Sequence, residues 1–472
     1  AAQRGVKGRL VFPRAMRRPG GPGQYAAKME KQPQGLAENK EEMDMELLTK
    51  APKGTVDLPP GATEKWQAVE DVLKSEAGLN GFGEIRTPVF EHTELFLRGV
   101  GDTTDVVEKQ MYTFTDKGGR SITLRPEGTA GAVRAMLENG LYHAGYPVKL
   151  YYCIPCFRYE KPQSGRLREF RTFGVEMFGA AEPAADVQVI ALALSAFKRM
   201  GLEDVGLQLN SIGCPTCRKE YHKALTEYFT AYKDRLCDTC LARLDRNPMR
   251  ILDCKSPVCQ EIGLGAPKIT DYLCGDCKAH FAKVQELLAA LGIAYELDPG
   301  LVRGLDYYTR TVFEFPSKSL GFALGGGGRY DGLVEELGGK PTPGLGFGLG
   351  LDRILMALEG KAAGFPEPVR CEVYIASMGG QAQQRAVLLM DKLHKCGVPA
   401  DCDLCARGLK AQMKYADRIG AKYTMVLGDN ELETGKAELK NMKTGEKVKI
   451  SIGDGFTDEY LTASTAQDGL GF

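Results

Sequence analysis

The spacing of hydrophobic residues changes along the chain, and each spacing predicts a different kind of element. Apolar residues three to four positions apart predict helices over 63–79 and 186–202, the first capped by Thr63. In 149–179 apolar and polar residues alternate instead, which predicts two antiparallel strands around the charged loop EKPQSGRLR. A further hairpin is predicted within 108–137, where it leads into a helix.

The last third of the chain combines glycine-rich strands with a regular α/β pattern. VFEF at 312–315 predicts a buried strand, because β-branched and aromatic residues favour strands. GLGFGLGLDRILMAL at 344–358 predicts a glycine-rich strand that leads directly into an apolar helix. From Pro366 onward strands and helices alternate, which predicts a compact α/β domain with a mainly parallel or mixed sheet.

Pattern and composition together divide the chain into regions. Residues 1–46 are basic, rich in glycine and proline and without sustained periodicity, which predicts a disordered extension. Two explanations of it stay open: an organelle transit peptide, or upstream sequence translated from a misassigned start before Met29 or Met43. The other regions are the first part of a core, a cysteine-rich insertion, the second part of the core, the α/β domain and a tail, over 47–202, 203–300, 301–365, 366–455 and 456–472.

Charge and hydropathy restrict the function less than the cysteines do. The 61 basic and 61 acidic residues cancel, which is weak evidence against a nucleic-acid partner because a local basic face is sufficient. No apolar run approaches the roughly 18–20 residues of a membrane span, so no membrane partner is expected. Fourteen cysteines in 472 residues are not typical of a secreted disulfide framework. They predict a reducing compartment, the cytoplasm.

Eight of these cysteines form close pairs: Cys214 with Cys217, Cys237 with Cys240, Cys254 with Cys259, and Cys274 with Cys277. Each spacing can turn two thiolates toward one metal ion, and two pairs can build a tetrahedral, purely structural Zn²⁺ site. The sequence does not decide which pairs combine. It also allows reduced thiols in a helical domain, or a metal site that is partly lost. A thioredoxin-type redox pair is less favoured, because no βαβ pattern surrounds the cysteines.

Charged residues occupy expected strand positions in the hairpin of 149–179. They are Arg158, Glu160, Glu169, Arg171 and Glu176. Charges in an otherwise apolar setting indicate an inward-facing polar site.

The segment LVRGLDYYTRTVFEF, residues 301–315, places an arginine and two tyrosines next to the predicted strand. The guanidinium of Arg303 offers a planar fork of donors that suits a carboxylate or a phosphate. Neighbouring strand residues point to opposite faces, so one of Tyr307 and Tyr308 is expected to face the same cleft as Arg303. The alternative is an arginine salt-bridged at a strand edge, with tyrosines in the core.

Two glycine runs precede further arginines. Gly325–Gly328 lack the Lys-Ser/Thr of a Walker loop, but their small size would let a flat ligand lie against a strand. Arg353 is expected near a helix N-terminus, where anions are favoured. Close packing of strand and helix, with a surface arginine, would explain either run equally well.

Basic residues also recur in the α/β domain at a spacing that places them on one helix face. They are Arg407, Lys410, Lys414, Arg418 and Lys422. A solvated face is the default interpretation of such a run, and phosphate contact is the more specific one.

Taken together, these residues resemble the histidyl-tRNA synthetases over roughly 47–455. FRYE at 157–160 with REFRTFGVEMFG is similar to the second signature motif of class II aminoacyl-tRNA synthetases. GLGFGLGLDR at 344–353 is similar to the third, and TPVFEH around Pro88 to the first, a dimer-interface element. LVRGLDYY and GGGGRYDGL resemble the two segments that distinguish the histidine enzyme.

The resemblance implies an α+β fold and a ligase activity. The expected fold has an antiparallel class II sheet with helices, an inserted mainly helical domain and a C-terminal α/β anticodon-binding domain, in a homodimer. The expected reaction activates L-histidine with ATP and Mg²⁺ to histidyl-adenylate. The histidyl group then passes to the 3′ end of tRNA(His).

The same resemblance implies roles for the residues of the ATP site. Arg303 would bridge the histidine carboxylate and the α-phosphate. Arg158 would bind the α-phosphate and Arg353 the terminal phosphate, which makes these three arginines the expected catalytic residues. Phe170 would stack on adenine, with Glu160 near its amino group.

It also implies how histidine and tRNA bind. Glu176 would accept a hydrogen bond from one imidazole nitrogen, and Tyr308, next to Tyr307, would bond at the other. Glu127 and Thr129 would hold the α-amino group. The loop 161–168 would approach the tRNA acceptor end through Gln163, Arg166 and Arg168.

Two positions depart from the family pattern, and two alternative functions stay open. Asp352 stands where a glutamate is usual, and Thr172 where glutamine is common, so the role of Thr172 stays undecided.

A non-catalytic relative, such as the regulatory subunit of ATP phosphoribosyltransferase or a tRNA-sensing module, shares this core. The regulatory subunit lacks the C-terminal domain and usually departs from RGLDYY, whereas this chain has both. A synthetase for another class II amino acid would lack both histidine-type segments.

Overall fold

The computed structural model describes residues 48–100, 104, 106–359 and 370–467. The disorder predicted for residues 1–46 concerns residues outside these ranges.

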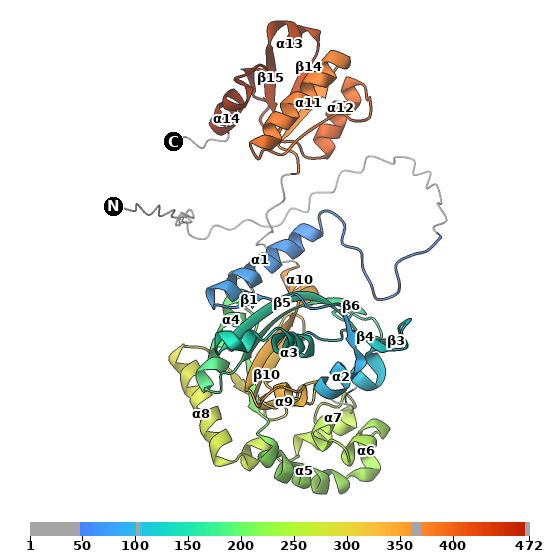
Figure 1. Cartoon of the computed structure of the whole chain (residues 1–472), viewed down its shortest axis with the longest axis vertical. Helices are drawn as coiled ribbons and strands as arrows, with labels where there is room; N and C mark the ends of the chain where they lie inside the picture. Colours follow the sequence, from blue (N-terminus) through green and yellow to red (C-terminus); the bar gives the residue numbers. More distant parts are fainter. Residues whose placement is uncertain (1–47, 101–103, 105, 360–369, 468–472) are drawn as a thin grey trace, which may run out of the picture. The chain divides into compact units, whose positions relative to one another are not determined.

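A large, mainly antiparallel sheet organises the described residues between 51 and 359 (Figure 1). Its strand order is β1-β5-β6-β11-β10-β9-β7-β8, and only the outermost pairs, β1 with β5 and β7 with β8, are parallel. The strands are β1 (Gly83–Glu84), β5 (Val148–Phe157), β6 (Glu169–Phe178), β7 (Gln208–Ser211), β8 (Glu296–Leu297), β9 (Thr309–Ser317), β10 (Phe322–Arg329) and β11 (Gly344–Gly350). The α+β class and the long hairpin predicted within 149–179 are both confirmed.

Helices cover one face of this sheet and leave much of the other to a cavity. The covering helices are α1 (Thr63–Leu79), α4 (Pro183–Arg199), α8 (Gly275–Ala290) and α10 (Leu351–Leu358). Leu73, Ile190 and Val284 from three of them share one hydrophobic core with Phe173 and Phe313 of the sheet. Helix α3 (Thr129–Glu138) packs on the opposite face.

The start of α1 differs from its prediction. Thr63 is the first helical residue, and Ala62 takes the cap position without a side-chain bond. The Glu64 carboxylate instead accepts the backbone N–H of Gly61 at 2.5 Å.

A second, three-stranded sheet carries the hairpin predicted within 108–137. Its order is β2-β4-β3, with β2 (Phe90–His92), β3 (Tyr112–Thr115) and β4 (Ser121–Leu124). Helix α2 (Thr93–Val100) and a π-helical turn over Val106–Gln110 adjoin it. Pro88 lies two residues before β2, which is an edge strand of this sheet.

The cysteine-rich region combines short helices with parts of the main sheet. Its helices before α8 are α5 (Pro215–Thr230), α6 (Asp238–Leu244) and α7 (Pro257–Leu264), with 3₁₀ turns at Lys233–Arg235, Pro248–Ile251 and Ile269–Tyr272. Strands β7 and β8 pair into the large sheet, and α8 packs against α4. The region predicted as 203–300 is thus continuous with the core at both ends.

The C-terminal region forms its own mixed sheet, as predicted. The order is β13-β12-β14-β15-β16, parallel around β12 and antiparallel beyond β14. Residues 456–467, set apart in the sequence as a tail, form α14, whose Phe456 and Tyr460 are fully buried in this domain's core. The elements are β12 (Val373–Ser377), α11 (Gly380–Lys395), β13 (Ala400–Cys402), α12 (Leu409–Arg418), β14 (Tyr423–Leu427), α13 (Asp429–Thr434), β15 (Lys436–Asn441), β16 (Lys447–Ser451) and α14 (Phe456–Gln467).

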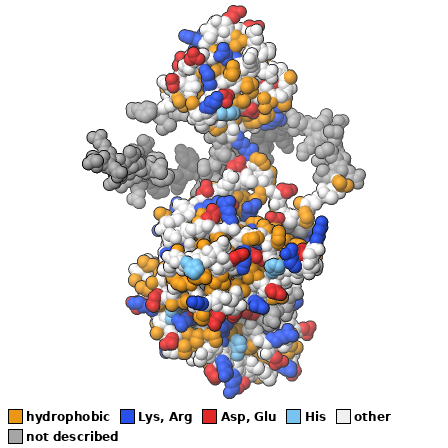
Figure 2. Space-filling model, viewed as in Figure 1, with side chains coloured by type: hydrophobic (Ala, Val, Ile, Leu, Met, Phe, Trp, Pro, Cys, Tyr) orange, Lys and Arg blue, Asp and Glu red, His pale blue; other side chains and the backbone are white. Residues whose placement is uncertain are grey.

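The surface agrees with the balanced composition. Figure 2 shows basic and acidic side chains interspersed over the visible face. Among the described residues, no helix combines the length and apolar character that crossing a membrane requires.

Candidate active site

A cavity of about 250 Å³ lies on the face of the large sheet opposite α1 and α4. Strands β6, β10 and β11, the starts of α3 and α10, and the turn before β9 supply its walls. The lining includes residues expected from the sequence at the phosphate and histidine ends: Glu127, Thr129, Arg158, Glu160, Phe170, Arg303, Tyr307, Tyr308 and Arg353. Arg166, expected in the loop that approaches tRNA, lines it as well. Segments more than 200 residues apart in the chain therefore meet at one site.

Glycines form the floor of the cavity. A Cβ atom on Gly326 would lie 2.4 Å from the Phe313 carbonyl oxygen and 2.9 Å from Nη1 of Arg303. One on Gly346 would lie 2.2 Å from the Val175 carbonyl oxygen. Backbone atoms cannot yield at these distances, so the strands approach each other and the arginine only without side chains.

Arg303 reaches the cavity from the turn that precedes β9. It forms an ion pair with Glu314 of β9, and its guanidinium lies 5.9 Å from the centre of the Tyr308 ring. Its Nε is buried without a hydrogen-bond partner. Because a buried donor without a partner is costly, this arginine is arranged to bind a further acceptor.

Both tyrosines of this turn line the cavity, whereas alternation predicted only one. The prediction treated residues 307 and 308 as strand, but β9 begins at Thr309, so alternation does not apply to them. Their rings lie 4.7 Å apart, and the Tyr307 ring meets Tyr330 edge-on at 5.5 Å.

Arg158 lies at the opposite wall. It donates from Nε to the Pro126 carbonyl at 2.9 Å, and its guanidinium lies 5.3 Å from the Phe170 ring centre. Arg158 and Glu160 were expected within a strand, but β5 ends at Phe157. The chain leaves the ladder there, because the Tyr159 N–H bonds to the Gln110 carbonyl instead of to β6.

Arg353 projects from the first turn of α10, as the strand-to-helix pattern predicted. Its Nε donates to the Gly165 carbonyl at 3.0 Å and its Nη1 to the Ala323 carbonyl at 2.8 Å. Burial lowers the pKa of its guanidinium, and the positive charges of Arg166 and Arg158 act in the same direction. Cations gathered this closely favour an anionic ligand.

Glu176 lies one layer behind the cavity wall. Its carboxylate accepts hydrogen bonds from Tyr152 Oη and Thr129 Oγ1, each at 2.8 Å, and from the Tyr330 hydroxyl. Burial raises the pKa of this carboxyl to about 8, although the three hydroxyls favour its ionised form. The site thus has an acceptor that can change its charge near neutral pH.

Glu127 and Thr129 meet at the N-terminus of α3. The Glu127 carboxylate accepts the backbone N–H groups of Thr129 at 2.6 Å and Ala130 at 2.9 Å. Burial raises the pKa of Glu127, while these two bonds lower it. A buried carboxylate held in this way can receive an ammonium group from the cavity.

The loop expected to meet tRNA is a tight hairpin. Gln163 and Arg166 exchange backbone hydrogen bonds at 3.1 and 2.9 Å, and Arg166 pairs with Glu160 at 3.3 Å. Arg168 turns back into the loop, where its guanidinium lies 4.1 Å from the Tyr159 ring centre. Gln163 and Arg166 are the more exposed members of the three.

Two charged residues expected in the site lie on the other face of the sheet. Strand alternation places Glu169 and Arg171 with the core residue Phe173, opposite to Phe170 and Thr172. The Arg171 backbone N–H bonds to the Asp352 carboxylate at 3.2 Å. Thr172 and Asp352 both line the cavity.

Arg329 of the glycine-rich segment has a structural environment. It is 1% exposed and donates from Nε to both Asp186 carboxylate oxygens at 2.9 Å. Its remaining nitrogens bond to the carbonyls of Ala180 at 2.9 Å and Glu182 at 3.0 Å. Burial and the neighbouring carboxylate leave no side of it facing a ligand.

Three residues of the site were not predicted from the sequence. Glu314 partners Arg303, and Tyr152 and Tyr330 position Glu176. Tyr330 stands inside the GGGGRYDGL segment, and Glu314 lies within VFEF, so both had a local signal. Tyr152 is one of several aromatics in β5 and had none.

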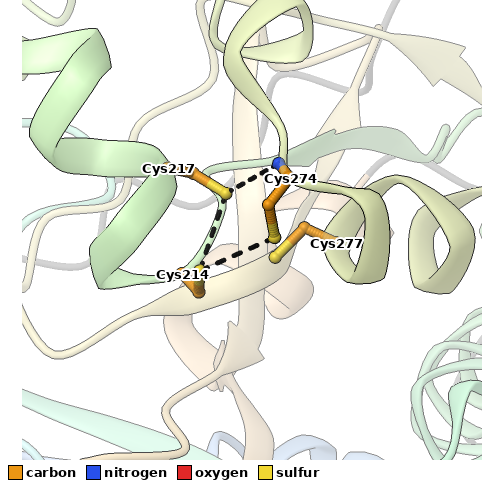
Figure 3. A group of neighbouring side chains, drawn as sticks. All are labelled: Cys214, Cys217, Cys274 and Cys277. Atoms are coloured by element: carbon orange, nitrogen blue, oxygen red, sulfur yellow. Dashed lines mark hydrogen bonds between the residues drawn. The ribbon is translucent and has the colours of Figure 1, made fainter.

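The cysteines of the insertion gather into two groups of four. Figure 3 shows the first group, in which Cys214 and Cys217 at the start of α5 meet Cys274 and Cys277 at the start of α8. The second contains Cys237, Cys240, Cys254 and Cys259. Within each group the ligand atoms lie within 4.8 Å of one another, and no disulfide joins them. Spacing alone could not establish this pairing of first with fourth and of second with third.

Comparisons with known proteins agree with this geometry. A family model described as histidyl-tRNA synthetase matches residues 54–215 and 268–354, more than half of the chain. A model described as anticodon binding domain matches residues 372–457. The histidine–tRNA ligase of Acetivibrio thermocellus is 53% identical over 408 residues, which cover 86% of this chain and 98% of that protein.

Solved structures give the same result. The apo histidyl-tRNA synthetase of S. aureus has a TM-score of 0.74 and 41% identity, and the match covers 87% of this chain and all of that one. A structure described as ATP phosphoribosyltransferase regulatory subunit/histidyl-tRNA synthetase from Bacillus halodurans C is 25% identical, with a TM-score of 0.58. The chain shares about half of its residues with histidine–tRNA ligases over nearly their full length, and it also matches the anticodon-binding model. These two matches overturn the regulatory-subunit alternative. The chain therefore belongs to the histidyl-tRNA synthetase family.

Proposed function

We propose that the cavity is where this histidine–tRNA ligase activates L-histidine with ATP and then charges tRNA(His). The observation that carries the proposal is the convergence of Arg158, Arg303 and Arg353 on one cavity that also holds two buried tyrosines and Glu127. In the first step a histidine carboxylate oxygen attacks the α-phosphorus of ATP, and pyrophosphate leaves. In the second, the 3′-hydroxyl of tRNA attacks the histidyl carbonyl, and AMP leaves.

The arginines divide the work on the phosphates. Arg303 bridges the histidine carboxylate and the α-phosphate, since it is the arginine nearest the tyrosines and keeps a free Nε. Arg158 binds the α-phosphate beside an adenine stacked on Phe170, with Glu160 at the adenine amino group. Arg353 binds the terminal phosphate. Phosphoryl transfer depends chiefly on such positioning and charge neutralisation.

The polar residues beside Arg303 select the amino acid. Glu127 and Thr129 hold the α-amino group, and Tyr308 bonds to one imidazole nitrogen. Glu176 accepts from the other nitrogen once the ring displaces part of its hydroxyl shell. An amino acid without these nitrogens would leave buried polar groups unpaired, which discriminates strongly.

Magnesium enters with the nucleotide. Among the described residues, the two cysteine groups are the clusters dense enough to hold a metal. Glu160, a carboxylate of the cavity, is already paired with Arg166. Mg²⁺ would therefore be bound mainly by the ATP phosphates, which is its usual manner in nucleotide sites.

Zinc fits the two cysteine groups. Tetrahedral Zn–S bonds of about 2.3 Å require sulfur–sulfur separations near 3.8 Å, and Cys214–Cys217, Cys214–Cys274 and Cys237–Cys254 measure 3.6, 3.9 and 3.8 Å. Backbone N–H groups bond to the sulfurs of Cys217 and Cys259 at 3.1 and 3.4 Å, which favours thiolates. We propose one structural Zn²⁺ in each group.

Metal analysis tests the zinc proposal. The purified chain should contain two zinc ions, Cys254→Ser should contain one, and Cys396→Ser, which removes an exposed thiol of the C-terminal region, should keep both. Folded protein without metal would refute it. Zinc thiolate sites, together with six further cysteines that form no disulfide, also agree with a cytoplasmic location.

The partner proposals rest on two surfaces. The hairpin loop with Gln163, Arg166 and Arg168 meets the acceptor end of tRNA(His), and the exposed Lys410 and Lys414, one turn apart on α12, contact its phosphates.

A homodimer would cover the exposed apolar side of the small sheet, where Phe90 is 56% and Phe114 48% exposed. Sedimentation should give a dimer, and a monomeric Phe90→Asp variant beside a dimeric Leu264→Asp control would locate its interface.

Histidine-dependent exchange of pyrophosphate into ATP tests the central proposal. The pure protein should catalyse exchange with histidine and not with other amino acids. No exchange, or equal exchange with several amino acids, would overturn it.

A further inference from the structure

The turn that carries Arg303 is held from outside the cavity by side chains of the cysteine-rich insertion. Residues 303–308 precede β9 and belong to no helix or strand. Arg250 donates from Nη2 to the Gly304 carbonyl at 2.6 Å and lies 3.2 Å from the Asp306 carboxylate. Asn247 donates to the same Asp306 oxygen at 3.2 Å. The turn is therefore bound at two of its residues by one short stretch of the insertion.

A third contact holds the end of the turn. Nη1 of Arg218, on α5, donates to the Tyr308 carbonyl at 3.2 Å. The contacts fall on residues 304, 306 and 308, whereas the side chains of Arg303, Tyr307 and Tyr308 face the cavity. Backbone and carboxylate atoms of the turn thus serve as its attachment, and the remaining side chains are free to bind ligand.

The attachment is buried, which distinguishes it from an accidental surface pair. The Arg250 side chain is 9% exposed and that of Asp306 23%. Removing the carboxylate partner of a buried arginine strongly destabilises the folded state, so this pair favours one geometry of the turn. By contrast, Arg235 of the same insertion is 54% exposed and lies 3.9 Å from Glu261, a pair with little energetic weight.

Each contact residue lies in a segment that also carries proposed metal ligands. Arg218 directly follows Cys217 of the first group. Asn247 and Arg250 lie between Cys240 and Cys254 of the second, and the Cys254 N–H bonds to the Ile251 carbonyl at 3.1 Å. A metal ion that fixes the cysteines would therefore also fix the contact residues.

We infer that the insertion is a brace for the catalytic turn, in which Arg250, Asn247 and Arg218 are positioning residues for Arg303 and Tyr308. The inference rests on the proposed roles of those two residues. Misplacing a reacting group by about 1 Å can cost on the order of a hundredfold in rate. A loosened brace should therefore impair histidine activation far more than it impairs folding.

The kinetics of Arg250→Ala in histidine-dependent pyrophosphate exchange test this inference. We expect kcat/KM for histidine to fall by about ten- to a hundredfold, with a smaller change in KM for ATP, because Phe170 on β6 and Arg353 on α10 hold ATP from outside the turn. Arg250→Lys, which keeps the charge but not the fork, should lie in between. Arg235→Ala should match the wild type, and zinc content should be equal in all four proteins.

A coupled pair of variants covers the case in which Arg250→Ala does not fold. Asp306→Asn keeps the acceptor oxygen and should fold, yet weakens the pair; its loss should not add to that of Arg250→Lys, because both act through one contact. Wild-type kinetics in folded Arg250→Ala, or fully additive losses in Asp306→Asn/Arg250→Lys, would overturn the brace. A wild type that does not respond to histidine would instead overturn the proposed function.

Discussion

The two faces of the large sheet both bury charged side chains, but they satisfy them to different extents. On the face covered by α4, Arg329 is fully enclosed by Asp186 and two backbone carbonyls. On the cavity face, Arg303 has Glu314 as its partner, yet its buried Nε is unpaired. Both arginines stand in segments typical of the family, so sequence alone does not separate their roles.

The difference shows which buried charge can bind a ligand. A guanidinium whose donors are all used has nothing to offer a substrate, and breaking its pairs costs stability. One with a spare donor gains an interaction when an acceptor arrives. Arg329 on the helix-covered face therefore stabilises the fold, whereas Arg303 on the cavity face keeps a donor that can bind a phosphate or carboxylate.

Replacing Arg303 should give the largest effect on activity. We expect Arg303→Ala to lower histidine-dependent pyrophosphate exchange by several orders of magnitude, because it removes the group between the two reacting anions. The variant should still fold, because Glu314, which loses its ion-pair partner, is 30% exposed and can be solvated. Retained activity would show that the unpaired donor does not mark the reacting position.

The reverse result is expected on the other face. Arg329→Ala removes the arginine that pairs with the buried Asp186, which then keeps only His280 Nε2 at 3.3 Å, and we expect a loss of about 3–5 kcal/mol in the free energy of unfolding. Denaturation followed by Trp66, the single tryptophan, reports on the core that α1 shares with the sheet.

An exposed pair supplies the control for that measurement. Lys283 and Glu286 are 49% and 65% exposed, so Lys283→Ala should cost less than about 1 kcal/mol. Equal free energies of unfolding for Arg329→Ala and Lys283→Ala would show that the buried, fully hydrogen-bonded arginine contributes no more to stability than an exposed ion pair does.

Much of the fold could be predicted from the sequence, because period and turn residues are local signals. The hairpin β5–β6, the strand-to-helix step at Gly350 and the mixed C-terminal sheet all follow from such signals. The helix α14 did not, since twelve residues of mixed character become a helix only when Phe456 and Tyr460 have a core to enter.

The site was predicted less evenly. Arg158, Arg303 and Arg353, which the motifs singled out, line one cavity, but Glu169 and Arg171, expected in the same polar site, lie on the other face of β6. Every second residue of a strand points away, and the motif does not say which parity faces the ligand. Partners such as Glu314 depend on the register between β9 and the preceding turn, which tertiary structure alone sets.

The cavity face also holds a buried acid, Glu176, and its raised pKa predicts a smaller, pH-dependent effect. Glu176 has a folded-state pKa of about 8, raised by burial, so it is neutral in the folded protein at pH 6 and ionised in the unfolded chain. Stability gained from this group is fully present only below the unfolded pKa and is lost as pH rises toward 8. Glu176→Gln has no such titration.

The difference between the two unfolding midpoints, Glu176→Gln minus wild type, should therefore increase from pH 5 to pH 8 and become constant above it. The measurement follows Trp66 fluorescence without ligand, so that the cavity face is compared in its unliganded state. A constant difference over this range would mean that Glu176 is ionised in the folded protein, held so by Tyr152, Thr129 and Tyr330. The cavity face would then be as fully satisfied around its acid as the opposite face is around Arg329, and the contrast would hold for Arg303 alone.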